Sequence, residues 1–335
     1  MSTYILRRLL LMVPTLLGIS VVCFVLIQFV PGGPVEEIIS KVRAGAAMRS
    51  GGASISADEV ANIKAYFGFD QPAYVRYFKW LGSVLTGDFG NSYVYQRPAL
   101  EVIVSKIPIS LFFGLTSFFL SYLISIPLGV WKAVVHGTLA DSLSSIVVFA
   151  GYVIPGFALG TLLIIYLSGG SYLDWFPIGG IVSSNFERLS AFDQILDFLH
   201  HMILPLFCYM LGQFAVLTLL MKNSVLDELN KDYVRTSMAK GLTFRNTIRK
   251  QVFRNSLIPI ATGIGSIFTA MFASALLIEK VFDIDGMGLL MYNSVVGRDY
   301  NVVLGIIILS SFFAMIGRLF SDLVYVAVDP RIRFE

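Results

Sequence analysis

Few residues of this 335-residue chain have the type and spacing that chemistry requires. His200 and His201 are adjacent, so on a helix their side chains point about 100° apart and do not ligate one metal ion together. Cys23 and Cys208 both lie in apolar runs, where a free cysteine behaves as a small hydrophobic residue. No H-E-x-x-H, C-x-x-C, G-x-S-x-G or phosphate-binding G-x-x-x-x-G-K-[ST] motif occurs. These absences predict a chain without catalytic residues, metal, cofactor or an ATPase site of its own.

The composition points to a membrane instead. Hydrophobic residues make up 56% of the chain and charged residues 14%, against roughly 45–50% and about 25% in soluble domains. A soluble enzyme and a disordered chain are both excluded by these proportions. The basic residues are not interleaved with aromatic stacking platforms, so nucleic acid is not an expected partner. Membrane lipid is the expected one.

Six segments are long and apolar enough to cross a bilayer, which takes about 20 residues of helix. Five of them contain no Asp, Glu, Lys or Arg. The sixth is uncharged to residue 317, and its apolar residues then resume to 328. The six segments are 9–30, 107–131, 142–170, 202–221, 257–278 and 301–317. The first run exceeds the ~7–15 apolar residues of a cleaved signal, so we expect it to be retained. The sequence predicts an all-α membrane protein with six transmembrane helices, forming one domain over 1–335.

Lysine and arginine predict the orientation, because they are enriched in short cytoplasmic loops. With a cytoplasmic N-terminus, the inner segments 1–8, 132–141, 222–256 and 329–335 hold 13 Lys/Arg in 60 residues. The short outer loops 169–201 and 279–301 hold 3 in 56. Both termini are therefore predicted to be cytoplasmic.

Two segments lie outside the predicted spans. The outer segment 31–106 opens with Pro-Gly-Gly-Pro, and a capping box at Ser56 and Glu59 predicts a helix near 57–67. In the inner segment 222–256, apolar spacing predicts a helix over 227–240 that Gly241 ends, and Thr243 is placed to cap a second helix reaching Arg254.

The inner segment also resembles a known family. Residues 232–242 read D-Y-V-R-T-S-M-A-K-G-L and residues 254–259 read R-N-S-L-I-P. This is similar to the EAA signature of importer-type ABC permeases, in the form found in peptide and oligopeptide permeases, although Arg235-Thr236-Ser237 stands where the general signature has Glu-Ala-Ala. Weaker matches at 5–18, 67–72, 87–98, 279–300 and 329–331 follow in the family's order. The Pro-Gly-Gly-Pro turn and the stretch 36–55 most resemble the Yej-type peptide permeases, the first of two paired subunits.

The resemblance implies a type I (MetI-like) importer fold and a division of labour. A second homologous permease, as a heterodimer, would complete the path. Two ATPase domains would bind ATP and Mg, and an extracytoplasmic binding protein would deliver peptide. It implies that the EAA-like segment forms a coupling helix against the ATPase, carried by Asp232, Tyr233, Arg235, Thr236, Ser237, Ala239, Lys240, Gly241, Leu242 and Pro259.

The translocation path is predicted less sharply. The candidates are hydrogen-bonding or small residues of the fifth span, namely Ser266, Thr269, Ala270 and Ser274. Small residues equally suit tight helix packing. Glu279 either faces a peptide amine or forms a local salt bridge, for example with Arg298. The outer segment either docks the binding protein or forms a lid, with Asp88, Asn91, Arg97, Arg298 and Asp299 as candidate contacts.

Three alternatives remain open from the residues. The first is a permease for nickel or another non-peptide solute, although no His- or Cys-rich path is present. The second is an ATP-independent secondary carrier, which the absence of acids from five spans disfavours. The third is an intramembrane hydrolase, for which no nucleophile–base or metal pair is found.

Overall fold

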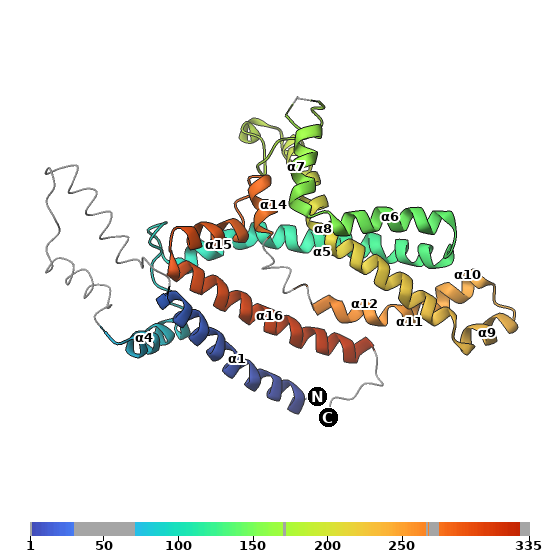
Figure 1. The fold of residues 1–335 in the computed structure, drawn as a ribbon, viewed down its shortest axis with the longest axis horizontal. Helices are drawn as coiled ribbons and strands as arrows, with labels where there is room; N and C mark the ends of the chain where they lie inside the picture. Colours follow the sequence, from blue (N-terminus) through green and yellow to red (C-terminus); the bar gives the residue numbers. More distant parts are fainter. Residues whose placement is uncertain (1, 30–70, 170–171, 266, 268–274, 329–335) are drawn as a thin grey trace. The chain divides into compact units, whose positions relative to one another are not determined.

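The computed structural model describes residues 2–29, 71–169, 172–265, 267 and 275–328 (Figure 1). These residues form helices and loops, with two isolated β-bridges and no strand among them. The predicted helix near 57–67 and the stretch 36–55 lie outside the described residues.

The chain divides into two compact units, one of residues 107–289 and 313–335, the other of residues 2–106 and 290–312. The helices before residue 190 are α1 (Ser2–Phe29), α4 (Ala73–Leu85), α5 (Ala99–Val134), α6 (Leu139–Val153), α7 (Gly156–Leu167) and the short η1 (Phe186–Arg188). Those after residue 190 are α8 (Ala191–Leu229), α9 (Asp232–Ala239), α10 (Phe244–Thr247), η2 (Ile248–Val252), α11 (Phe253–Ser256), α12 (Ile258–Thr262), η3 (Gly263–Gly265), α14 (Leu276–Val281), α15 (Met287–Val296) and α16 (Tyr300–Val328).

In the part of the chain that the structure describes, four single helices are long and apolar enough to cross a membrane: α1, α5, α8 and α16. They cover four of the six predicted spans. Prolines occur inside three of them, at Pro14, Pro108, Pro127 and Pro205. Membrane helices tolerate proline because neighbouring groups satisfy the freed carbonyls.

The other two predicted spans differ from expectation. The span predicted over 142–170 is interrupted in the structure, because α6 and α7 meet at a bend of 101°. Pro155 is the N-cap of α7 and cannot donate to α6, which breaks the helix there. The span predicted over 257–278 begins as α12 and η3, and most of its residues beyond Gly265 lie outside the described part of the chain.

Two apolar clusters organise the unit formed by 107–289 and 313–335. The first joins α5, α8 and α14 through Phe113, Met202, Cys208 and Ile278, so Cys208 is a buried hydrophobic residue as predicted. The second joins α5, α8, α9, η2 and α12, with members Ala133, Leu217, Met221, Val225, Val234, Val252 and Ile260. We call this second group the α9 cluster.

In the unit formed by 2–106 and 290–312, aromatic residues of α4 pack against α1. The ring of Phe24 lies 5.4 Å from that of Tyr77 and 5.9 Å from that of Trp80, and Ser20 hydrogen-bonds Tyr77 at 2.9 Å. In the same unit, Ile103 and Val302 are fully buried.

Candidate functional site at segment 222–256

Helix α9 is a separate helix rather than the end of α8. The single helix predicted over 227–240 is wrong, because α8 ends at Leu229 and α9 begins at Asp232. Asn230 caps α8, and Lys231 has an extended backbone (ψ 148°) that turns the chain before α9.

Gly241 ends α9 as predicted. Its φ of +88° is in the left-handed region, which glycine adopts without a Cβ penalty. Its N–H donates to the carbonyl of Met238 at 2.9 Å, and the N–H of Leu242 donates to that of Ser237 at 3.2 Å. These two bonds form a Schellman motif. Thr243 then caps α10, accepting from the N–H of Asn246 at 3.4 Å, also as predicted.

The inner face of α9 is held to its neighbours by three of its residues. Val234, 1% exposed, belongs to the α9 cluster. The Tyr233 hydroxyl donates to Glu228 at 2.5 Å and accepts from Asn255 at 3.2 Å. Ser237 donates to Gln251 at 2.5 Å. Burial, reinforced by the bond to Glu228, raises the pKa of Tyr233.

The remaining EAA-like residues of α9 face away from the fold. Asp232, Arg235, Thr236, Ala239 and Lys240 are exposed, as is Gly241. The carboxylate of Asp232 and the guanidinium of Arg235 are 4.0 Å apart at the surface. Pro259 lies in the first turn of α12, where its missing N–H has no helical partner to lose. The predicted set therefore separates into an inner anchoring group, Tyr233 and Ser237, and an exposed face.

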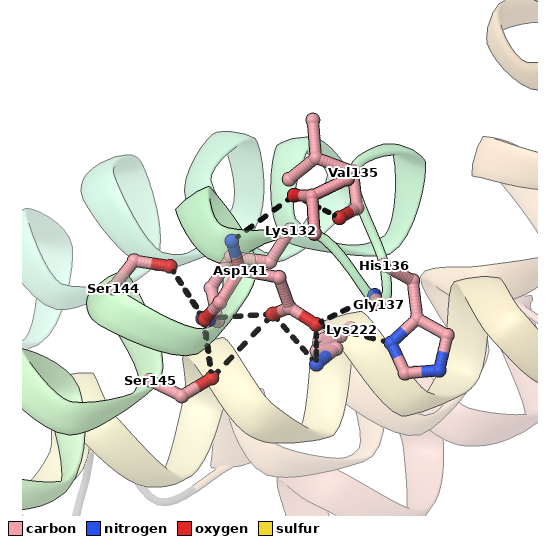
Figure 2. Close-up of polar contacts among 9 residues, drawn as sticks. Lys132, Val135, His136, Gly137, Asp141, Ser144, Ser145 and Lys222 are labelled. Atoms are coloured by element: carbon pink, nitrogen blue, oxygen red, sulfur yellow. Dashed lines mark hydrogen bonds and ion pairs between the residues drawn. The ribbon is translucent and has the colours of Figure 1, made fainter.

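A buried ion cluster lies next to this segment and was not predicted (Figure 2). The Lys222 ammonium of α8 donates to both carboxylate oxygens of Asp141 at 2.8 Å, and the Lys132 ammonium of α5 lies 3.2 Å from one of them. Ser144 and Ser145 accept from Lys132 at 2.7 and 2.8 Å. Lys132 is 0%, Asp141 5% and Lys222 9% exposed. Charges at the ends of apolar runs are usually interpreted as solvated loop residues, which is why the sequence pattern did not reveal them.

Of the predicted path residues, only Glu279 is described; Ser266, Thr269, Ala270 and Ser274 lie outside the described residues. Glu279 is 1% exposed. One carboxylate oxygen accepts from the Tyr209 hydroxyl at 3.1 Å and the other from the N–H of Leu289 at 2.7 Å, in the first turn of α15. Burial raises the pKa of Glu279.

The predicted outer contacts form part of a structured loop in the unit of 2–106 and 290–312. Asp299 is fully buried and accepts from the Ser92 hydroxyl and from the N–H of Val94 at 3.2 Å. Asn91 accepts from the Asn301 amide at 2.8 Å. Asp88 accepts from the N–H of Gly90 at 2.8 Å, Arg97 is exposed, and Arg298 is half-buried. Asp299 is thus placed to hold the loop rather than to meet another protein.

Among the residues that the structure describes, no three His, Cys, Asp or Glu side chains gather in one place. The two histidines are instead bound to backbone. His200 Nε2 is 2.6 Å from the carbonyl oxygen of Trp175, and His201 Nδ1 is 2.8 Å from that of Asp197.

Comparison with known proteins identifies the class. Residues 125–334 match the family described as the binding-protein-dependent transport system inner membrane component, and residues 1–114 match the N-terminal region of such components. The chain belongs to this family, as its EAA-like segment predicted. It is a multi-pass protein of the bacterial inner membrane and a non-catalytic permease subunit.

Among its relatives, the chain is 39% identical to the peptidoglycan transport system permease protein YejB of Agrobacterium fabrum, over 100% of this chain and 99% of that protein. It is 36% identical to the oligopeptide transport system permease protein AppB of Bacillus subtilis, over 100% of both. It is 31% identical to the glutathione transport system permease protein GsiC of Salmonella typhimurium, again over 100% of both.

Proposed function

We propose that this chain is one of two permease subunits of an ATP-driven importer that moves peptides or peptide-like compounds into the cytoplasm. The names of the relatives, which specify oligopeptide, glutathione and peptidoglycan transport, support this substrate class. The other permease, two ATPase domains and an extracytoplasmic binding protein complete the complex. The subunit has six spans, and both termini lie in the cytoplasm.

The observation that carries the proposal is the build of α9. A helix of eight residues is anchored on one face by Val234, Tyr233 and Ser237 and presents the other to solvent. The exposed face carries Arg235, Thr236, Ala239 and Lys240, side chains that suit a groove with acidic or carbonyl partners. A rigid anchor with an exposed face is what a coupling helix needs to transmit ATPase closure to α8 and α12.

The outer-loop residues and the residues of the fifth span take the remaining roles. Asp88, Asn91, Arg97 and Arg298 contribute to docking of the binding protein, with Asp299 holding their loop. Ser266, Thr269, Ala270 and Ser274 line the peptide path. Glu279 supports that path from its buried position by holding the first turn of α15.

The test begins with purification of the chain from its native membranes and identification of the subunits that copurify. The complex is then reconstituted in liposomes, and uptake of labelled peptide is measured with and without ATP. We expect a second permease, P-loop ATPase domains and ATP-dependent uptake. Uptake by the chain alone without ATP would make it a secondary carrier, and uptake of nickel without peptide would support the non-peptide alternative.

The coupling role is tested at Gly241. Proline at 241 loses the N–H that binds Met238 and cannot adopt a φ of +88°, whereas asparagine tolerates left-handed backbone. We expect G241P to lose peptide uptake while ATP hydrolysis continues, and G241N to keep both. Normal uptake by G241P would remove the coupling assignment.

Docking of the binding protein is tested by deletion of residues 36–55, which belong to the outer segment. We expect the complex to assemble and its basal ATP hydrolysis to persist, while stimulation by the binding protein weakens. Unchanged stimulation would contradict a docking role for this stretch.

A further inference from the structure

Three buried charges connect three helices at one point of the unit formed by 107–289 and 313–335. Lys132 belongs to α5, Asp141 to α6 and Lys222 to α8, and all three side chains converge (Figure 2). The carboxylate also accepts from the N–H of Gly137 at 3.3 Å and lies 3.1 Å from His136 Nδ1. Removing one partner of such a buried pair leaves an uncompensated charge, which is strongly unfavourable.

The two lysines make different kinds of connection. Lys132 is nine residues from Asp141, and the turn of residues 135–138 already joins α5 to α6. Its ammonium also binds the carbonyl of Asp141, at 3.1 Å, so it strengthens a local turn. Lys222 is 81 residues from Asp141. The Lys222–Asp141 contact ties the turn between α5 and α6 to α8. No short stretch of chain joins that turn to α8.

Lys222 also lies beside the anchor of α9. Its neighbour Met221 and Val225, one turn later, are fully buried in the α9 cluster together with Val234 of α9. The α9 cluster also contains Ala133, the neighbour of Lys132. A displacement of α9 therefore reaches α8 at the residues that flank Lys222.

The ion pair and the apolar contacts respond differently to such a displacement. Packed helices can move past one another by small shear movements, because apolar contacts have no fixed partner atoms. The Lys222–Asp141 pair is shielded from water, so moving the ammonium away from the carboxylate leaves Lys222 as a buried charge without this partner and is costly. The Lys222–Asp141 pair thus fixes the register between α8 and the start of α6.

We infer that Lys222 and Asp141 are a positioning pair through which movement of α9 reaches α6, so that the number of ATP molecules hydrolysed per peptide depends on their contact. This inference rests on the proposed function. It assigns to the pair a role in coupling in addition to any role in folding.

The chain offers a matched pair of variants to test it. K222M and K132M make the same substitution, remove the same charge and each leave one lysine paired with Asp141. Only K222M disconnects α8. In liposomes containing the complete importer, we expect K222M to raise the ATP hydrolysed per peptide by at least about 5-fold, the lower end of typical coupling between sites. K132M should stay near the wild-type ratio, and K222R, which keeps the charge, should restore it.

The outcomes separate the inference from the proposed function. If the wild-type complex shows no ATP-dependent peptide uptake, the proposed function fails. If wild type transports and K222M keeps its ratio, or if K132M uncouples equally, the inference alone is overturned. Assembly is checked first by size-exclusion chromatography, and K222Q, measured with the same expectation, replaces K222M if that variant does not assemble.

Discussion

Ser92 and Asp299, 207 residues apart in the sequence, form a buried hydrogen-bonded pair in the unit of 2–106 and 290–312. The same Ser92 oxygen accepts from the N–H of Tyr95 at 2.8 Å, and the Asp299 carboxylate also accepts from the N–H of Val94. One serine and one aspartate therefore hold the 92–95 turn to the residues before α16. In this arrangement hydrogen bonds to two side chains give the loop a defined shape.

This pair predicts that S92A destabilises its unit. Removing the hydroxyl leaves a buried carboxylate without one donor, which costs about 1–3 kcal/mol. We expect a lower melting temperature of the purified protein and faster proteolysis within residues 87–98. S105A is the control, because Ser105 is exposed and donates only to the carbonyl of Val102 in its own helix. Equal behaviour of S92A and wild type would show that the pair contributes no stability.

The second prediction concerns the approach of α5 to α8. A Cβ at Gly129 would lie 2.6 Å from the Cβ of Met221 and 2.8 Å from the carbonyl oxygen of Thr218. G129A must therefore push the helices apart, and we expect it to lose about 1–3 kcal/mol of stability. At Gly212 of α8 nothing lies within 4 Å, so G212A should gain about 0.5–1 kcal/mol from its better helix propensity. Thermal unfolding in detergent measures both, and a stable G129A would contradict the close packing.

Local signals in the sequence predicted the parts of the site that depend on neighbouring residues. Gly241 and Thr243 were recognisable because a helix end and a helix start have fixed residue preferences over a few positions. The four unbroken spans were predictable from runs of apolar residues. The α6–α7 bend was missed because an apolar run containing Pro155 resembles one span when its length alone is counted.

Long-range pairs were not predictable in this way. The contact of Lys222 with Asp141 and that of Ser92 with Asp299 depend on which helices become neighbours, and no spacing in a single sequence encodes that. Charges near span ends fit the rule for cytoplasmic loops whether they are solvated or buried. Asp299 was predicted to be a contact for the binding protein, but it is fully buried and instead holds the 92–95 turn.

The third prediction is a pH dependence that arises from Glu279. Burial raises its pKa above the ordinary value of 4.5. As the pH rises above 4.5, the Glu279 carboxyl therefore stays protonated to a higher pH in the folded chain than in the unfolded chain. The contribution of Glu279 to stability is therefore largest below pH 4.5 and falls as the pH rises from 4.5 through the raised pKa of the folded chain. E279Q cannot titrate. We expect the melting temperature of wild type minus that of E279Q to decrease as the pH rises from 4.5 towards neutrality. A difference that stays constant or increases over this range would contradict the assignment.

The fourth prediction concerns the anchor of α9. The Tyr233 hydroxyl is the link between Glu228 at the end of α8 and Asn255 of α11, so Y233F removes two hydrogen bonds while keeping the ring in the α9 cluster. A hydrogen bond to a charged group is worth about 1.5–3 kcal/mol, which corresponds to roughly 10- to 100-fold in an opening equilibrium. Hydrogen–deuterium exchange of residues 232–240 should accelerate by that factor.

Because the change is local, exchange in α5 and in the first half of α8 should not change. Y172F serves as the control, since Tyr172 is exposed and distant in sequence from α9. If exchange in Y233F accelerates throughout the unit, the hydroxyl supports the whole fold and not α9 in particular. If exchange in 232–240 is unchanged, Val234 and the bond from Ser237 to Gln251 hold the helix without it, and the face that we propose for the ATPase is positioned by packing.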